Sequence, residues 1–522
     1  MPELGFLGWL RWIWRQLTSM RVALLLLLLL AVASLPGSLV PQRPQDPGAV
    51  ASYLEENPTV GLWLDRLGFF DVYASAWFSA IYLVLFVSLV GCIVPRARAH
   101  LRALRSEPPQ VPRSFERFGV RAEVVVEAPA ADVRDGALAA LKRRYRTRTG
   151  SQARRSEHGP TLTIRAERGY LRETGNLVFH LALVGVLVGV ALGQLFGYRG
   201  QVLVVEGRGF ANAVVAYDSF TAGAWFRDQS LEPFSLTLDV VGAEFDPATL
   251  APRDFGAAVT VREPDRADRS EIIKVNRPLQ AGGARVYLAG NGYAPRLTVH
   301  DGAGEVAFSG PVPFLPQDAA YTSRGVVKVP DVSAGQPQLG FVGFLLPTAV
   351  VSDDGLRSVF PQPLEPLLVL TAYAGDLGLD DGIPQNVYEL DTSRMGVVTA
   401  QGLLEPGSAA DAEQLVLGPG QRVDLPEGLG SVTFESLPRF AALDLRHDPA
   451  LGALLAFALL AIGGLVGSLF VPRRRIWLRL TPAADGRTVV AAAALARGED
   501  PGLRQDLDRV VEAARSTPRE DT

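Results

Sequence analysis

The residues of this chain that could bind a metal or carry redox chemistry are few and widely separated. Its five histidines stand at positions 100, 158, 180, 300 and 447, so their spacing brings no metal cluster together. Cys92 is the only cysteine, which excludes an internal disulfide, a CxxC redox centre and covalent haem attachment through CxxCH. We interpret Cys92 as a small apolar packing residue.

His180 differs from the other histidines in its surroundings. It lies about one turn inside the apolar stretch GNLVFHLALVGVLVGVALG at 175–193. Ionisable groups cost free energy in hydrocarbon and normally face a bundle interior, a cavity or a partner. A neutral imidazole can donate an interhelical hydrogen bond, relay a proton, or bind haem iron axially while its second nitrogen donates a hydrogen bond. The residues alone favour the interhelical hydrogen bond over haem ligation and place the proton relay third.

Several enzyme classes are excluded by motifs that the sequence does not contain. No GxxxxGK[ST] phosphate loop, HExxH zinc motif, GxSxG elbow or kinase signature is present. Glycine patterns such as GVLVGVALG are typical of close helix packing and not of nucleotide binding. No nucleic-acid partner is expected.

Four stretches are long and apolar enough to cross a membrane, and one of them contains His180. A helix rises about 1.5 Å per residue, so about 20 apolar residues cross roughly 30 Å of hydrocarbon. The first stretch could be a signal peptide, but its length and the Pro36-Gly37 pair near its outer end favour a retained helix. The predicted transmembrane helices are 22–40, 77–94, 175–196 and 450–471.

The distribution of charge predicts the orientation of these helices. The loop 95–174 carries about 18 Lys and Arg, whereas 198–448 spreads a similar number over about 250 residues and is net acidic. Basic flanks stay in the cytoplasm. We therefore expect cytoplasmic segments at 1–21, 95–174 and 472–522, and extracytoplasmic segments at 41–76 and 197–449.

The segment 197–449 is expected to fold as a mainly β domain. Its apolar runs are short, alternating and β-branched, and turn signals such as DGAGE and SDDG separate them. This pattern predicts an antiparallel domain, either sandwich-like or an open barrel. The loop 95–174 adds RAEVVVEA, ADVRDGALAALKRRY and TLTIRAERG, which predict a small αβ element, and the tail predicts a strand-like piece followed by a helix or a disordered end.

The four predicted helices resemble those of a known family in order and in detail. SMRVALLLLLLLAVASLPGSLVPQ, LGFFDVYASAWFSAIYLVLFVSLVGCIVPR and GYLRETGNLVFHLALVGVLVG are similar to the first three spans of ResB proteins, the CcsB half of the System II cytochrome c biogenesis machinery. IIKVNRPLQAGGARVYLAGNGYAP resembles an outer block of that family, and DLRHDPALGALLAFALLAIGGLVGSLFVPRRRIW resembles its last span. The chain is identified as a member of this family from near residue 18 to near residue 480.

This resemblance implies a function in haem delivery. A ResB-type subunit in the bacterial plasma membrane works with a Trp-rich ResC or CcsA partner, moves haem b outward, and supports its attachment to reduced CxxCH thiols of apocytochrome c. His180 corresponds to the family's intramembrane histidine, which implies an axial ligand to transient, non-covalently bound haem iron. No other predicted span contains a histidine, so the second imidazole would come from the partner. The chain would not be an enzyme alone, and a thioredoxin-like thiol reductase would be a further partner.

Alternative interpretations concern both single residues and the whole chain. Asn276, Arg277, Pro278 and Tyr293 of the outer block are read as turn and core residues, and His447 as an interfacial residue instead of a haem ligand. The β domain could dock the apocytochrome or the outer face of the partner. A membrane-tethered β-domain receptor or sensor without haem is the alternative function, although such a protein would not need an imidazole in its third helix. A tethered hydrolase would need a nucleophile and base that the outer segment lacks.

Overall fold

The fold is described from a computed structural model that covers residues 5–45, 47–156, 159–353, 355–379, 386, 388–399, 402–404, 414–496 and 498–516. The chain divides into two compact units. One unit combines residues 1–191 with residues 450–522, and the other consists of residues 192–449. His158 lies outside the described residues.

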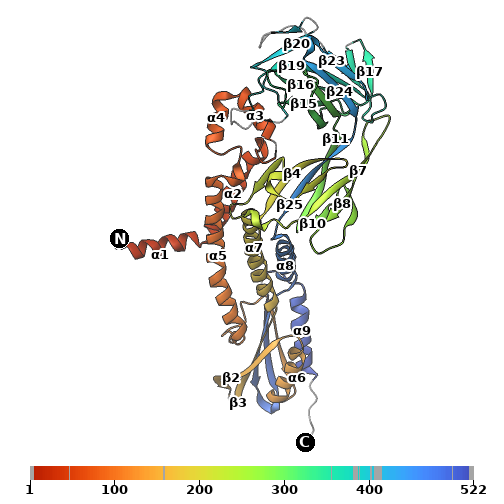
Figure 1. Cartoon of the computed structure of the whole chain (residues 1–522). Helices are drawn as coiled ribbons and strands as arrows, with labels where there is room; N and C mark the ends of the chain where they lie inside the picture. The colour runs from red at the N-terminus through yellow and green to blue at the C-terminus, as the bar shows by residue number, and fades with distance from the viewer. Residues whose placement is uncertain are drawn as a thin grey trace. The chain divides into compact units, whose positions relative to one another are not determined.

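Four helices in the described part of the chain are long and apolar enough to cross a membrane, which confirms the predicted helices. Ser19 and Ser75 cap two of them, because each hydroxyl accepts a backbone N–H bond of 3.3 Å from the residue three positions later. The second helix extends beyond its predicted end at 94 and contains Pro95. The four are α2 (Met20–Leu39), α5 (Ala76–Arg105), α7 (Tyr170–Phe196) and α8 (Leu451–Phe470) (Figure 1).

Shorter helices flank the first two long ones. The α1 helix places Trp9, Trp12 and Trp14 on exposed positions, as a helix at a membrane interface would. The segment between α2 and α5 folds into two short helices and a 3₁₀ turn instead of remaining an irregular loop. Their bounds are α1 (Phe6–Leu17), α3 (Pro47–Glu56), α4 (Pro58–Arg66) and η1 (Val72–Ala74).

The basic loop and the tail build one αβ domain together. Its antiparallel sheet has the strand order β1-β27-β26-β3-β2, so tail strands lie between loop strands. Helices α6 and α9 contribute apolar side chains to the same core as the sheet. The elements are β1 (Val120–Val126), α6 (Ala130–Lys142), β2 (Arg146–Ser156), β3 (Gly159–Arg168), β26 (Arg474–Pro482), β27 (Thr488–Ala496) and α9 (Gly502–Arg515).

This shared sheet restricts the topology of the long helices. In β26, Leu478 pairs with Ile164 of β3, and the two strands stay in register over seven residues. Strands that hydrogen-bond must lie on the same side of any membrane that the helices cross. The first residue of α7 and the last residue of α8 therefore lie on the same side of the membrane. Which side is the cytoplasm remains a prediction from charge.

The second unit consists of antiparallel sheets, and none of the sheets formed by its described residues closes into a barrel. Two of these sheets share one core, in which alternate residues of facing strands are buried. Their orders are β10-β11-β25-β4-β6 and β5-β7-β8-β9. The strands are β4 (Tyr198–Val205), β5 (Gly209–Ala211), β6 (Ser219–Ala222), β7 (Ser235–Phe245), β8 (Pro252–Arg262), β9 (Arg269–Lys274), β10 (Leu279–Ala281), β11 (Ala284–Tyr293) and β25 (Arg439–His447).

A further pair of sheets in this unit encloses a second core. One has the order β13-β12-β24-β23, and the other β14-β15-β16-β19-β20-β21 with β22 beside β19; β17 and β18 form a hairpin. The expectation of an antiparallel, sandwich-like domain is thus met by two cores instead of one. The strands are β12 (Arg296–Asp301), β13 (Val306–Pro311), β14 (Leu315–Pro316), β15 (Ser323–Val329), β16 (Gln338–Leu346), β17 (Ala349–Ser352), β18 (Gly355–Ser358), β19 (Leu367–Gly375), β20 (Met395–Thr399), β21 (Gly402–Leu403), β22 (Gln414–Leu417), β23 (Arg422–Leu425) and β24 (Gly430–Ser436).

Candidate functional site

His180 lies within α7 with one ring nitrogen engaged. Nδ1 lies 2.7 Å from the backbone carbonyl oxygen of Asn176, four residues earlier. A carbonyl oxygen can only accept, so Nδ1 carries the proton and donates this bond. The neutral ring then keeps its lone pair on Nε2, for which the described residues provide no hydrogen-bond partner. This is the form of imidazole that binds a metal.

The side of α7 that carries His180 is the side that α5 contacts. Glu173, His180 and Leu187 follow at seven-residue intervals, about two helical turns, so they share one stripe. At one end of the stripe, Nδ1 of His100 lies 3.4 Å from the Glu173 carboxylate. At the other end, the hydroxyl of Tyr82 donates a hydrogen bond to the Leu187 carbonyl. His180 lies between these two contacts.

The opposite side of α7 packs closely against α8 through glycines. A Cβ atom on Gly464 would lie 2.6 Å from the Phe179 nitrogen and 2.7 Å from the Gly175 carbonyl oxygen. A Cβ atom on Gly185 would overlap the ring of Phe457. The prediction that GVLVGVALG favours close helix packing is confirmed, and this packing fixes the backbone on both sides of His180.

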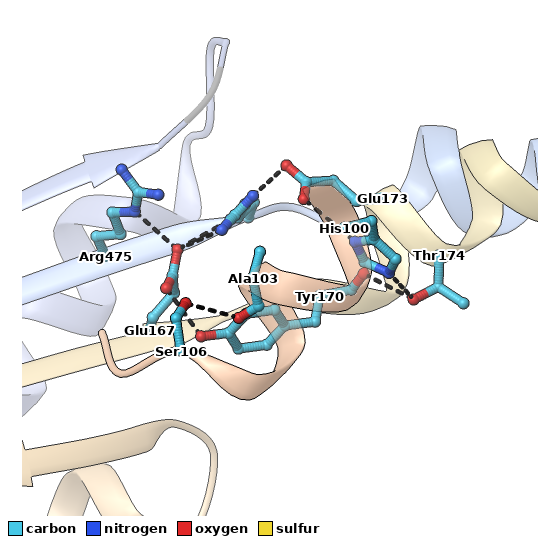
Figure 2. A network of polar contacts seen from close by, with 9 residues as sticks. His100, Ala103, Ser106, Glu167, Tyr170, Glu173, Thr174 and Arg475 are labelled. Carbon is cyan, nitrogen blue, oxygen red and sulfur yellow. Dashed lines mark hydrogen bonds and ion pairs between the residues drawn. The ribbon is translucent and has the colours of Figure 1, made fainter. Parts of the chain in front are cut away.

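A buried polar network holds the end of α7 where the chain begins the helix (Figure 2). The Glu167 carboxylate, only 3% exposed, accepts bonds from Arg475 at 2.7 Å and Tyr170 at 2.8 Å, and pairs with Arg473 at 2.8 Å. Arg473 also pairs with Glu173 of α7. Burial opposes ionisation of Glu167, but the bonds from Arg475 and Tyr170 outweigh it and lower its pKa. The network thereby connects the start of α7 to the strand that follows α8.

His100 belongs to this network, a role that could not be predicted from the sequence. It lies in α5 beyond the predicted span and is 7% exposed. The hydroxyl of Thr174 donates to the Tyr170 carbonyl, so it accepts from Nε2–H of His100 at 2.9 Å (Figure 2). The sequence shows the charged residues of α5 and α7 but does not show which of them contact each other.

The remaining histidines of the described chain have separate surroundings. His447 donates from Nδ1 to the Gly283 carbonyl at 2.9 Å and stacks on the ring of Tyr198 at 5.3 Å between ring centres. His300 belongs to β12, where its Nδ1 atom is buried without a hydrogen-bond partner. Among the described residues, no group of three or more His, Cys, Asp or Glu side chains is arranged to hold a metal ion. His180 is therefore considered as a single ligand.

Cys92 contacts a neighbouring helix end. Its Sγ atom lies 2.8 Å from the Thr18 carbonyl oxygen, just before α2 begins. Gly91, the residue before it, faces the same segment, since a Cβ atom on Gly91 would overlap the side chain of Thr18. This position agrees with the interpretation of Cys92 as a packing residue.

The polar residues of the outer block have structural positions. Asn276 adopts a left-handed conformation with φ of 65° in the turn that follows β9. Tyr293 is fully buried, donates its hydroxyl to the Pro361 carbonyl at 2.8 Å, and lies 4.6 Å below the guanidinium of Arg439. Burial raises the pKa of Tyr293 to about 12. These contacts support the interpretation of both residues as turn and core residues.

Comparisons with known proteins extend over nearly the whole chain. Residues 20–508 match the ResB-like family. A protein from Synechococcus sp. (strain WH7803), named cytochrome c biogenesis protein CcsB, is 31% identical over 278 residues, which cover 52% of this chain and 59% of that protein. Proteins of the same name from strains CC9311 and RCC307 are each 26% identical, over 91% and 88% of both chains respectively. With α2 to α8 and the first half of α9 inside the matched region, the chain belongs to the ResB-like family.

Proposed function

We propose that this chain acts in cytochrome c biogenesis and that His180 is an axial ligand to haem during its passage across the membrane. Haem b is the substrate in this proposal, bound transiently and without a covalent bond. The proposal is supported by membership of the ResB-like family and by relatives named for cytochrome c biogenesis.

The observation that carries the proposal is the state of the His180 ring. The bond from Nδ1 to the Asn176 carbonyl fixes the tautomer and the ring orientation. The Nε2 lone pair is then available to iron. A simple interhelical hydrogen bond, the competing interpretation, would need a donor for Nε2, and the described residues supply none.

The second axial ligand is proposed to come from a Trp-rich ResC or CcsA partner. His100 is the other histidine of the long helices, but it contacts α7 at Glu173 and Thr174, six or seven residues from His180. That separation corresponds to roughly 10 Å along a helix. Two imidazoles on opposite faces of one iron would lie much closer, because metal–nitrogen bonds are about 2 Å long, as in zinc sites.

Attachment of haem to apocytochrome c needs reduced CxxCH thiols. Cys92, the one cysteine of this chain, lies in α5 against Thr18 and has no second thiol to work with. A separate thioredoxin-like protein is therefore proposed to reduce the apocytochrome. The β unit would present the docking surface for the apocytochrome or for the partner.

Replacement of His180 tests the proposal. His180→Ala, co-expressed with a ResC or CcsA partner and an apocytochrome c, should lower haem in the purified complex and abolish covalent cytochrome c. Added imidazole should restore part of both, because it can occupy the vacant coordination position. Haem is measured by absorption spectroscopy and holocytochrome by haem staining.

Leu187→Ala is the matched control, since Leu187 shares the stripe of His180 and engages Tyr82 only through its backbone. It should retain haem and cytochrome maturation. Unchanged haem and normal maturation in His180→Ala would return this residue to the hydrogen-bond interpretation.

A further inference from the structure

An open pocket lies where α7 begins and α8 ends, within the unit that contains the long helices. Its volume is about 520 Å³. The residues that line it come from the turn after α6, from β2 and β3, and from the two helix ends. They include Arg144, Arg146, Glu167, Arg168, Leu171 and Phe470.

The charged groups in this pocket do not balance one another. The Glu167 carboxylate is already bound by Arg473 and Arg475. Arg168 is paired with the buried Asp506 at 2.8 Å. Two other guanidinium groups line the pocket, and their partners decide its net charge.

Arg144 and Arg146 supply the excess positive charge. Within the described chain, neither forms an ion pair with a carboxylate. Arg146 donates from Nη1 to the Leu104 carbonyl at 2.6 Å, which is a neutral partner. Arg144 has an exposed side chain and no partner of this kind among the described residues. The pocket therefore presents two uncompensated guanidinium groups to an incoming anion.

The rim of the pocket is apolar and belongs to the two helices. Leu171 is 66% exposed and Phe470 is 77% exposed. Both lie at the ends of helices that are apolar enough to cross a membrane. When these helices span a bilayer, the two side chains lie at the boundary between acyl chains and headgroups, and the arginines lie on the headgroup side.

We propose that this pocket binds the headgroup phosphate of an anionic phospholipid, with the acyl chains along Leu171 and Phe470. Guanidinium groups bind phosphate through parallel N–H bonds and carry a charge that is never lost at physiological pH. The apolar rim favours a lipid over a soluble anion. The predicted orientation places the pocket at the cytoplasmic leaflet, where anionic lipids are concentrated. The bound lipid stabilises the helix ends that the Glu167 network joins.

Neutralisation of the two arginines tests this site. The full chain is purified as wild type, as Arg144→Gln with Arg146→Gln, and as the matched control Lys142→Gln with Arg143→Gln. The control removes the same charge from exposed neighbours that do not line the pocket. Each protein is reconstituted into phosphatidylcholine vesicles with or without phosphatidylglycerol, and retained lipid is counted by native mass spectrometry.

The wild type and the control should retain phosphatidylglycerol and show a higher unfolding temperature in its presence. The double variant should bind it roughly thirtyfold more weakly, since each basic residue contributes roughly a fivefold step in binding to anionic lipid. Arg144→Gln alone, at an exposed side chain with no partner to lose, should weaken binding roughly fivefold and guards against misfolding of the double variant.

Three results would overturn the proposal. Equal retention of phosphatidylglycerol by the double variant and the wild type would show that the pocket is not the site. An equal loss in the control would show diffuse charge attraction instead of a pocket. The full stabilisation by inorganic phosphate without phosphatidylglycerol would show a soluble-anion site and not a lipid site.

Discussion

At the scale of single residues, the His180 ring is held by its own helix. Its Nδ1 atom donates a hydrogen bond to the Asn176 carbonyl, which fixes the tautomer and leaves Nε2 for the proposed iron ligation. That bond runs to the backbone four residues earlier, a geometry available to many helical histidines. The sequence could therefore not distinguish it from an interhelical bond, which requires knowledge of the neighbouring helix.

Glu167 was not predictable, for a related reason. It lies in TLTIRAERG, where the sequence indicated only a strand. Its partners Arg473 and Arg475 are some 300 residues away in the sequence, and Arg475 lies directly opposite Glu167 on the neighbouring strand β26. In the sequence, the arginines after the last transmembrane helix were interpreted only as a sign that the tail is cytoplasmic. The structure shows that two of these arginines also compensate a buried carboxylate.

The lowered pKa of Glu167 predicts a pH-dependent contribution to stability. A carboxylate with a folded-state pKa below its unfolded value of about 4.3 stabilises the fold above that value, and the contribution disappears as pH falls through the folded pKa. Glu167→Gln should lower the free energy of unfolding by about 3 kcal/mol at pH 7, because it removes the buried carboxylate that pairs with Arg473 and Arg475. The difference from the wild type should shrink below about pH 4.

Denaturant unfolding of the purified chain in detergent at neutral and acidic pH measures this effect. Glu107→Gln is the control, since Glu107 is 54% exposed and pairs with Arg148 and Arg165 at the surface. Its cost should stay below about 1 kcal/mol. A constant difference between Glu167→Gln and the wild type across the acidic range would contradict the assignment.

At the scale of elements, strands with alternating apolar residues were predictable and polar strands were not. QVLVVEG, GAAVTVRE and LLVLTAY correspond to β4, β8 and β19. RTRTGSQARRS, which forms β2, has no apolar alternation and pairs only at the edge of its sheet. An edge strand with two polar faces buries little apolar surface, so its sequence shows no periodic pattern of apolar residues.

The contact between α7 and α8 gives a prediction with an internal control. Gly464→Leu must separate the helices, because the new side chain meets the backbone of Phe179 and Gly175. We expect a loss of about 1–3 kcal/mol in stability, as for overpacked cores. Haem retention in the complex should fall as well, because Phe179 precedes His180.

Gly463→Leu adds the same side chain at the preceding position, where no atom lies within 4 Å of the added Cβ. It should leave both the unfolding temperature and haem content close to wild type. Thermal unfolding in detergent and haem absorption measure the two effects. Equal losses in the two variants would mean that the α7–α8 packing does not position His180.

At the scale of the whole molecule, the sequence indicated the order of segments but not which of them assemble. The small αβ element was expected in the basic loop, and a strand-like piece followed by a helix or a disordered end was expected in the tail. Instead β26 and β27 lie between β3 and β1. Such long-range strand pairing leaves no mark in local periodicity, because each strand needs only an alternating pattern and not a named partner.

This pairing sharpens the test of membrane orientation. Reporter fusions at about residue 60 and about residue 320 should report an outside location, whereas fusions near residue 120 and after residue 480 should report inside. The last fusion is best placed beyond α9, so that β26 and β27 keep their partners. The two inner fusions must agree with each other, since their segments share a sheet. An outside signal from the site near 120 would reverse the orientation and the depth assigned to His180.

The division of labour between subunits predicts that this chain alone does not make cytochrome c. Attachment needs haem held in place, reduced CxxCH thiols beside its vinyl groups, and control of the iron while the thioether bonds form. This chain provides the imidazole of His180 in an apolar helix and a β unit, and its single cysteine lies in α5. In a host without other maturation systems, the chain expressed alone should retain little haem, and co-expressed apocytochrome should stay unmodified.

Addition of a ResC or CcsA partner should restore haem retention and attachment, measured by absorption and haem staining. The same partner with His180→Ala should restore neither. Covalent cytochrome c formed by this chain without a partner would refute the division.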